Sequence, residues 1–192
     1  MLASLIIVRY IFLDRDGVLN RKLPEGGFVS GWDQFQWLPG AVEAVARMTR
    51  AGWIVMVVTN QRGIALGRLT ETQLEGIHAN MRADLERHGA RLAGIYYCPH
   101  DRGECECRKP GTGLFEQAQK EFSQMASDNS VVIGDSLSDI QAGKQLGMKT
   151  IFIRGEASTR KDGAEAAASL ADAVAGSLLE AVEVHLGLTI QP

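Results

Sequence analysis

Runs of apolar residues recur along the chain and alternate with stretches that have helical periodicity. The apolar runs cover residues 5–13, 53–58, 94–97, 131–133 and 150–153, and the helical stretches cover 40–51, 70–88, 113–125, 137–147 and a part of 164–186. The apolar runs contain few polar residues, which predicts strands that helices cover on both faces. The whole pattern therefore predicts an α/β fold with a central parallel sheet.

Residues near the predicted helix starts support two of the boundaries. Pro39 and Gly40 precede the first helix, and Thr70 with Gln73 three residues later has the pattern of a capping box for the second. The segment 20–37 is long for a connection between a strand and a helix, which predicts a functional loop or short flap. The polar, alanine-rich segment 155–176 predicts a loop that leads to a peripheral helix.

Length and charge narrow the class of protein. A chain of 192 residues with 45% hydrophobic residues suits one domain, residues 1–192. The net charge of -3 is spread over interspersed acidic and basic residues, so nucleic acid and membrane surfaces are not expected partners. The apolar start lacks the features of a signal peptide, and no apolar run reaches the ~20 residues that span a bilayer. We expect a soluble, monomeric, cytoplasmic protein.

Two aspartates follow the first apolar run directly, in the sequence IFLDRDGVLN. Residues two apart in a strand point to the same side, so Asp14 and Asp16 are expected to emerge together. Carboxylates that close repel each other, which favours a shared cation or a reaction that uses one as nucleophile and the other as acid. An ordinary polar turn is the alternative on this stretch alone.

Polar residues follow three further strands as well. They are Thr59, Asn60 and Gln61 after the second strand, residues 98–109 after the third, and Gly134 and Asp135 after the fourth. Ligands of open parallel sheets bind beyond the carboxyl ends of the strands. Four strands that end in polar groups predict a functional site there and weigh against the turn-only interpretation.

The segment CPHDRGECEC contains all three cysteines of the chain and offers a second set of ligands. The set consists of Cys98, His100, Cys105 and Cys107. Three thiolates and an imidazole suit tetrahedral Zn²⁺, and a tight turn at Gly103 joins the two short arms. A disulfide is the alternative, but it leaves one cysteine unpaired. We predict a structural zinc ion that stiffens the loop with Arg108 and Lys109, because four protein ligands leave no position for water.

Four short motifs together resemble a known superfamily. DRDG follows the first strand, TN the second, RKP lies in the loop after the third, and GDSLSD begins at the end of the fourth. This ordered set resembles the haloacid dehalogenase (HAD) superfamily of aspartate-nucleophile phosphatases over about residues 8–155. The resemblance implies a Rossmann-like, three-layer sandwich with a central parallel sheet, a short flap loop and a zinc-binding loop.

The same resemblance implies catalytic roles. Asp14 would be the nucleophile that forms an aspartyl-phosphate, which splits one difficult displacement into two easier ones. Asp16 would protonate the leaving alkoxide and then activate the water that hydrolyses the intermediate. Thr59 and Lys109 would hold the phosphoryl oxygens, the first through its hydroxyl and the second as a compact positive charge.

A catalytic Mg²⁺ is also implied. Asp14, the backbone carbonyl of Asp16 and Asp135 would bind it, and oxygen ligands suit such a hard ion. Asp139 is a further candidate, either behind these ligands or through water. It has an equally good interpretation as an acidic residue that stabilises the start of a helix.

A narrower resemblance concerns the substrate. CPH followed by CECRKP, the segment TNQRGIALG and the flap sequence GGFVSGWDQFQWLPG are similar to the zinc-containing heptose bisphosphatases, which are related to histidinol-phosphatases. This implies a phosphomonoesterase that removes the 7-phosphate of D-glycero-D-manno-heptose 1,7-bisphosphate on the route to nucleotide-activated heptose for lipopolysaccharide core or a related glycan. KLPEG in the flap and KPGTG after the lysine motif depart from the family pattern, which bears on substrate preference.

A sugar with a second phosphate needs a positive group away from the reacting centre. Arg108 is the first candidate, followed by Arg62 and Lys22, and each has the alternative of a solvated surface charge. The other residues assigned to substrate binding are Asn60, Gln61 and Ser136. No function is assigned to His78, His88 and His185, which fall in or beside predicted helices.

Three other functions compete with this one. One is a non-enzymatic, zinc-stabilised binding domain that keeps the fold but has lost activity. The presence of every catalytic residue of the motifs weighs against it. Among enzymes, histidinol-phosphatase is the runner-up. A 3′-phosphatase acting on nucleic-acid ends ranks behind it because that substrate calls for a basic groove.

Overall fold

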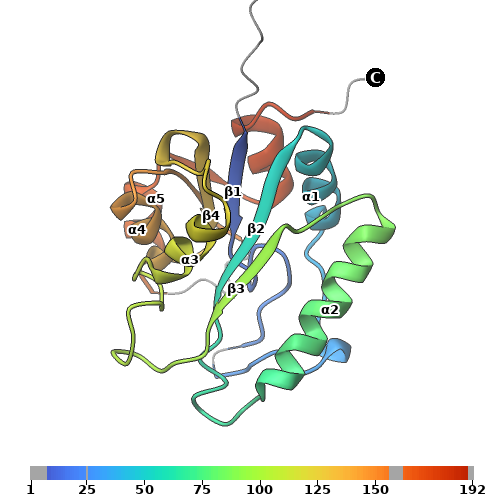
Figure 1. Ribbon diagram of the computed structural model, residues 1–192, viewed down its shortest axis with the longest axis vertical. Helices are drawn as coiled ribbons and strands as arrows, with labels where there is room; N and C mark the ends of the chain where they lie inside the picture. Colours follow the sequence, from blue (N-terminus) through green and yellow to red (C-terminus); the bar gives the residue numbers. More distant parts are fainter. Residues whose placement is uncertain (1–7, 25, 156–161, 190–192) are drawn as a thin grey trace, which may run out of the picture.

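Six parallel strands form one sheet at the centre of the molecule (Figure 1). The computed structural model describes residues 8–24, 26–155 and 162–189. The strands are β1 (Arg9–Leu13), β2 (Trp53–Asn60), β3 (Gly94–Cys98), β4 (Ser130–Gly134), β5 (Lys149–Ile153) and β6 (Ala173–Ala175), in the spatial order β3-β2-β1-β4-β5-β6. The five predicted strands are confirmed, except that residues 5–7 lie outside the described residues.

Helices cover both faces of the sheet. They are α1 (Ala41–Arg50), α2 (Glu71–Arg87), α3 (Gly113–Glu121), α4 (Leu137–Gln145), α5 (Ala164–Leu170) and the one-turn α6 (Leu178–Glu180), which continues as a π-helical turn, Ala181–His185. In Figure 1, α1 and α2 lie on one side of the sheet, and α3, α4 and α5 lie on the other. The predicted three-layer α/β sandwich is confirmed. None of the helices in the described ranges is long and apolar enough to cross a bilayer.

The C-terminal part differs from the prediction of one helix within 164–186. Strand β6 separates α5 from α6 there. It pairs with β5, and the carboxylate of Asp172 accepts hydrogen bonds from the backbone N–H (2.8 Å) and the hydroxyl (2.9 Å) of Thr150 just before that pairing begins. Alanine is common in helices, so its abundance here masked a strand of three residues. Residues 156–161 of the predicted loop lie outside the described residues.

Side chains of β1 show why its sequence lacks polar alternation. Ile11 and Leu13 are buried in the core that includes α1 and α2. Tyr10 and Phe12 are buried in the core on the opposite face, which includes α3. Both faces of the strand are therefore inside the protein, as expected for a parallel sheet between two helical layers.

The predicted helix starts are confirmed. Gly40 precedes α1 with a φ of 76°, a left-handed conformation that glycine adopts without steric cost. At the start of α2, Gln73 N donates to Thr70 Oγ1 (3.2 Å), and Thr70 N donates to Gln73 Oε1 (2.7 Å). This reciprocal capping box satisfies two donors that a helix leaves without intrahelical partners.

The carboxyl ends of the strands meet at the lower end of the molecule in Figure 1. Leu13 at the end of β1 aligns with Val57 of β2 and with Ile133 of β4. The backbone N–H of Asp14 then donates to the carbonyl of Ile133 (2.9 Å), which extends the alignment by one residue. The segments after β1 and β4 therefore start side by side, while β2 runs three residues further, to Asn60, and this is the register on which the site depends.

The predicted flap, residues 20–37, returns from the end of β1 towards α1. Asn20 forms isolated β-bridges with Asp16 and Trp37. The indole N–H of Trp37 donates to Asp84 of α2 (2.6 Å). These contacts pair the two ends of the flap with each other and hold the Trp37 end against α2.

Candidate active site

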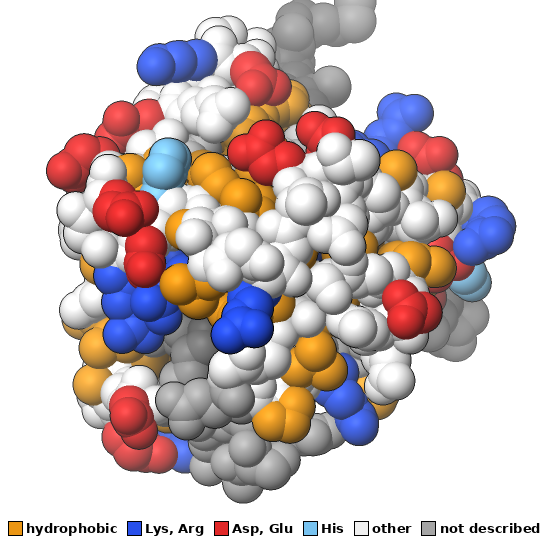
Figure 2. All heavy atoms as spheres, turned by 90° about the horizontal axis from the view of Figure 1, so that it is seen from below, with side chains coloured by type: hydrophobic (Ala, Val, Ile, Leu, Met, Phe, Trp, Pro, Cys, Tyr) orange, Lys and Arg blue, Asp and Glu red, His pale blue; other side chains and the backbone are white. Residues whose placement is uncertain are grey.

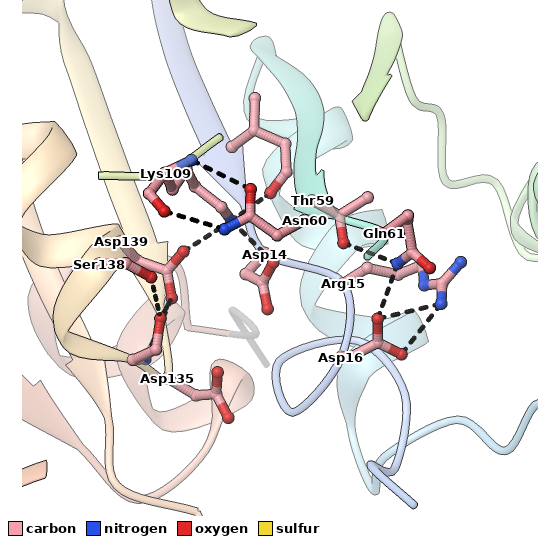
Figure 3. Close-up of polar contacts among 12 residues, drawn as sticks. Asp14, Arg15, Asp16, Thr59, Asn60, Gln61, Lys109, Asp135, Ser138 and Asp139 are labelled. Atoms are coloured by element: carbon pink, nitrogen blue, oxygen red, sulfur yellow. Dashed lines mark hydrogen bonds and ion pairs between the residues drawn. The ribbon is translucent and has the colours of Figure 1, made fainter. Parts of the chain in front are cut away.

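Three carboxylates converge at the carboxyl end of the sheet (Figure 3). Asp14 follows β1, Asp135 follows β4, and Asp139 lies in the first turn of α4. One oxygen of each lies within 4.8 Å of the others, and Asp14 and Asp139 are buried. We call these three residues the carboxylate cluster. Like charges at this spacing repel strongly, so the cluster is stable only with positive groups beside it.

Lys109 supplies one of those positive groups from the loop after β3. Its Nζ donates to Asp14 Oδ1 (2.8 Å) and to the carbonyl of Val58 (2.5 Å), and it lies 2.6 Å from Asp139 Oδ1. The lysine is almost completely buried, and burial alone would disfavour its charge. Asp139 and Asp14 outweigh that effect and raise the pKa of Lys109 above its ordinary value, so the ammonium stays charged.

Asn60, the last residue of β2, holds the backbone of Lys109. Its side-chain amide donates to the carbonyl of Lys109 (3.1 Å), and its Oδ1 accepts from the N–H of Lys109 (3.0 Å). Sequence reasoning assigned Asn60 to substrate binding. Its side chain engages both backbone groups of Lys109, which makes it a clamp on that residue, and a role of Asn60 in substrate binding stays a prediction.

Asp139 is oriented by the cap of its own helix. Its Oδ2 accepts from the backbone N–H (3.0 Å) and the hydroxyl (2.5 Å) of Ser136, which leaves Oδ1 towards Lys109. A Cβ atom at Gly134 would lie 2.1 Å from Asp139 Cβ, so only glycine fits there. The Ser136 hydroxyl also lies 2.9 Å from that of Ser138. A role of Ser136 in substrate binding stays a prediction.

Asp16 has a different environment from Asp14. Its carboxylate accepts from Arg15 Nη2 (3.1 and 3.0 Å), Asn20 Nδ2 (2.9 Å) and Gln61 Nε2 (2.9 Å), as Figure 3 shows for Arg15 and Gln61. Burial raises the pKa of this carboxyl, but the charge of Arg15 and the three sets of hydrogen bonds outweigh it and lower the pKa. Because β1 ends at Leu13, strand alternation does not extend to Asp16, and its carboxylate is not part of the carboxylate cluster.

Thr59 and Gln61 connect the end of β2 to the same network. Gln61 Nε2 donates to Thr59 Oγ1 (3.0 Å) as well as to Asp16, and both residues are buried. The side chain of Gln61 therefore links two groups. One is the Thr59 hydroxyl, which we expect beside the phosphoryl group, and the other is the Asp16 carboxylate, which we expect to act as acid and base.

Lys22 reaches the carboxylate cluster from the flap, where it forms an ion pair with Asp135. Both side chains are about nine-tenths buried. Gly17 makes this approach possible, because a Cβ atom there would lie 2.1 Å from Asp135 Oδ2 and 2.5 Å from Lys22 Cε. The flap thus contributes a second positive charge to the cluster.

The predicted zinc ligands converge as well, and we call them the cysteine cluster. Cys98, His100, Cys105 and Cys107 each bring a ligand atom to within 4.8 Å of the others, and all three cysteines are free. Sγ of Cys98 is 3.4 Å from that of Cys105, which is 3.2 Å from that of Cys107. His100 Nδ1 lies 3.6 Å from Cys98 Sγ and 3.3 Å from Cys107 Sγ.

The chemistry and spacing of the two clusters suit two different metal ions. Ligands about 2.3 Å from a tetrahedral zinc are about 3.8 Å apart, so the cysteine cluster is a slightly contracted tetrahedron of the right donors. The carboxylate cluster offers only oxygen atoms, which suits a hard cation such as Mg²⁺. The residues present therefore fit both ions.

Two arginines lie near the cysteine cluster. Arg62, just after β2, forms an ion pair with Asp101, so it links the segment after β2 to the segment after β3. Arg108 is partly buried, and its Nη1 has no hydrogen-bond partner among the described residues. Within the described ranges, Arg108 is thus the one of these two arginines that has a buried donor without a hydrogen-bond partner.

Arg15 and His78, like Asn20, belong to the Asp16 network and were not identified from the sequence. No role was assigned to Arg15, and no function to His78. Both are buried, and Arg15 Nη1 lies 3.4 Å from His78 Nε2. The available signal was the position of His78 on the buried face of α2, one turn after Leu74, where a polar residue needs a partner.

Comparisons with known proteins agree with this geometry. Residues 106–181 match a family model described as HAD-hydrolase-like. A curated relative from Mycobacterium bovis, D-glycero-alpha-D-manno-heptose-1,7-bisphosphate 7-phosphatase, is 35% identical over 88% of this chain and 87% of its own length. A relative from Pasteurella multocida, named for the beta anomer of the same bisphosphate, is 38% identical over 86% of this chain and 92% of its own.

A solved structure is similar over nearly the whole chain. It is D,D-heptose 1,7-bisphosphate phosphatase from B. bronchiseptica, complexed with magnesium and phosphate, with a TM-score of 0.82 and 30% identity over 95% of this chain and 100% of that one. These matches confirm the resemblance seen in the four motifs and in the cysteine segment. The chain therefore belongs to the heptose-1,7-bisphosphate 7-phosphatase family of HAD-like hydrolases.

Proposed function

We propose that this protein is a Mg²⁺-dependent phosphomonoesterase that removes the 7-phosphate of D-glycero-D-manno-heptose 1,7-bisphosphate. The observation that carries the proposal is the contact of Lys109 with Asp14 inside the carboxylate cluster. A carboxylate can attack a phosphate only where positive charge offsets that of the phosphoryl oxygens. The names of the relatives supply the substrate class, and both anomers occur among them.

In the proposed first step, one oxygen of Asp14 attacks phosphorus and the bond from phosphorus to the sugar oxygen breaks. Asp16 gives a proton to that oxygen, so the sugar leaves as an alcohol. The product of the step is an aspartyl-phosphate on Asp14. In the second step, Asp16 takes a proton from water and the water oxygen attacks phosphorus. The bond from phosphorus to the Asp14 oxygen breaks, which frees the carboxylate and releases inorganic phosphate.

Residues around the nucleophile support these steps. The buried ammonium of Lys109 is close enough to Asp14 to stabilise the charge of a transferring phosphoryl group. Thr59 is the proposed hydroxyl donor to that group. A Mg²⁺ ion held by Asp14, Asp135 and the backbone of Asp16 would supply further charge neutralisation, and Asp139 is positioned to orient Lys109.

Arg108 is the proposed partner of the second phosphate. Its buried Nη1 has no hydrogen-bond partner among the described residues, whereas the guanidinium of Arg62 is already paired with Asp101. A planar guanidinium that offers several donors suits a phosphate. Figure 2 looks onto the end of the molecule where the strands finish, and basic and acidic side chains are interspersed there. Such a face supports a small substrate over a nucleic acid.

A panel of phosphate-release assays tests the proposal. It contains both anomers of the heptose bisphosphate, histidinol phosphate and hexose 6-phosphates, with Mg²⁺ present. We expect the highest kcat/KM for one heptose bisphosphate anomer, with a product that retains its 1-phosphate. A higher kcat/KM for histidinol phosphate would replace the proposed substrate. The absence of turnover with every compound would favour a binding domain.

A further inference from the structure

A buried contact between Arg15 and His78 connects the general acid/base to helix α2. Arg15 is only 1% exposed, and its Nη2 donates to both oxygens of Asp16 (3.1 and 3.0 Å). Its other terminal nitrogen, Nη1, lies 3.4 Å from Nε2 of His78, which is also buried. The guanidinium therefore lies between the catalytic carboxylate and an imidazole that is 63 positions further along the chain.

The chemistry of the two groups fixes the direction of this hydrogen bond. A guanidinium has only donors, so Nε2 of His78 must be the acceptor, and the imidazole must be neutral with its proton on Nδ1. The surroundings favour that form, because burial and the charge of Arg15 lower the pKa of His78 to about 3. The ring also packs against Tyr97 of β3, with centroids 5.9 Å apart.

Few other groups fix the guanidinium of Arg15. Its Nε is buried without a hydrogen-bond partner among the described residues. The backbone of Arg15 is held, since its carbonyl accepts from the N–H of Leu19 (2.9 Å) and of Asn20 (3.1 Å). The position of the guanidinium is thus set by Asp16 on one side and His78 on the other. Loss of the His78 imidazole would leave Nη1 of Arg15 without a partner among the described residues.

We propose that Arg15 and His78 are positioning residues that hold the Asp16 carboxylate in line with the leaving oxygen of the substrate. His78 fixes the guanidinium from α2, and the two Nη2 contacts of the guanidinium fix the plane of the carboxylate. This inference rests on the proposed function, because it assumes that Asp16 transfers the proton. Neither residue touches the substrate, so both act on the reaction through Asp16.

The test exploits the leaving group. An alkyl phosphate releases a strongly basic alkoxide and needs a well-placed acid, whereas p-nitrophenyl phosphate releases a stable phenolate and does not. The constant kcat/KM covers the steps up to release of the alcohol, so it isolates the acid role of Asp16 from its later role as base. Each variant is therefore compared on heptose 1,7-bisphosphate and on p-nitrophenyl phosphate.

Three variants of α2 separate positioning from structure. His78→Leu removes the acceptor and keeps the site apolar, His78→Gln retains an oxygen that can accept from Arg15, and Ile77→Val removes one buried methyl group beside it without touching the network. We expect His78→Leu to lose about tenfold in kcat/KM on the bisphosphate and less than about threefold on the aryl phosphate. His78→Gln and Ile77→Val should remain close to wild type on both.

The outcomes are distinct. Selective loss in His78→Leu with recovery in His78→Gln supports the proposal. Equal losses on both substrates, no loss, or a selective loss that glutamine does not relieve would overturn it. Asp16→Asn is measured in parallel: if this variant lacks the same leaving-group selectivity, the role of Asp16 in the proposed function fails, whatever His78 does. Thermal melting of each variant confirms that the folded protein is being compared.

Discussion

The carboxylate cluster and the cysteine cluster lie beyond the same end of the sheet but are assembled in opposite ways. Asp14 is distant in sequence from Asp135 and Asp139 and meets them only because β1 and β4 pair in one register. The four residues of the cysteine cluster come from a single segment of ten, 98–107. The first cluster depends on the whole fold, whereas the second needs only one loop. Lys109 lies two residues after Cys107 and connects them. The cysteine cluster can therefore position the ammonium of Lys109 within the carboxylate cluster.

The largest expected effect is loss of the nucleophile. Asp14→Asn should lower phosphate release by at least about a thousandfold, because an amide cannot form the acyl-phosphate. Zinc content should not change, because Lys109 still has Asp139 as a partner. The cysteine cluster meets β1 only through packing in the core, which the substitution leaves in place. Steady-state assays and metal analysis measure the two properties. Turnover that survives removal of any wild-type contamination would exclude Asp14 as the nucleophile.

Chelation should separate the two clusters by their affinity. A mild chelator is expected to abolish activity, and added Mg²⁺ to restore it, because oxygen ligands that are shared with solvent and substrate hold Mg²⁺ weakly. About one zinc per chain should remain, since four protein ligands enclose it. Activity assays and metal analysis on the same samples provide the test. Recovery with zinc in place of magnesium would mean that the clusters have been assigned to the wrong ions.

A change within the cysteine cluster should act on catalysis at a distance. Cys107→Ser is expected to lower zinc content and the thermal midpoint, and to cost on the order of a hundredfold in kcat/KM, because a displacement of ~1 Å in a positioning group has that effect. Glu106→Gln is the matched control, since it changes an exposed residue between two ligands. If zinc-free protein keeps full activity and stability, the cysteine cluster plays no part in the site.

The smallest expected effect concerns the two hydrogen bonds between Asn60 and the backbone of Lys109. Asn60→Ala removes both side-chain hydrogen bonds to the Lys109 backbone and should lower kcat/KM about tenfold, less than a full displacement of the loop. Zinc content should stay at the wild-type value. Asn80→Ala on the exposed face of α2 is the control. A fall in zinc content with Asn60→Ala would show that the clusters form one unit that cannot be separated.

Much of the fold followed from the spacing of apolar residues. Five strands and the first four helices lie close to their predicted positions because each combines a clear period with recognisable ends, as at Thr70 and Gln73. Strand β6 was missed because three residues are too few to show a period and two of them are alanine. α3 ends at Glu121, whereas the helical pattern continued to 125.

The site was predictable where it depended on strand ends and not where it depended on side-chain directions. The register of parallel strands brings Asp14 and Asp135 together, and that follows from topology alone. Which way Asn60, Asp16 or Arg15 turns depends on partners from distant elements, such as the backbone of Lys109 and the imidazole of His78. No sequence period reports such contacts, so the side-chain partners of Asn60 and Asp16 and the place of Arg15 beside them could not be predicted.

The short strand β6 also has a consequence for solubility. It covers the outer edge of β5, whose sequence KTIFI is rich in β-branched and aromatic residues and would otherwise offer unpaired backbone groups to another chain. β6 itself has three residues and is followed by Gly176, so the edge that it presents is too short to template a further strand. We expect a chain cut before Asp172 to be prone to aggregate, because it would lose this cover together with the core residues Leu178, Ala181 and Val182. The shortest strand of the sheet thus leaves little free edge for pairing with another chain.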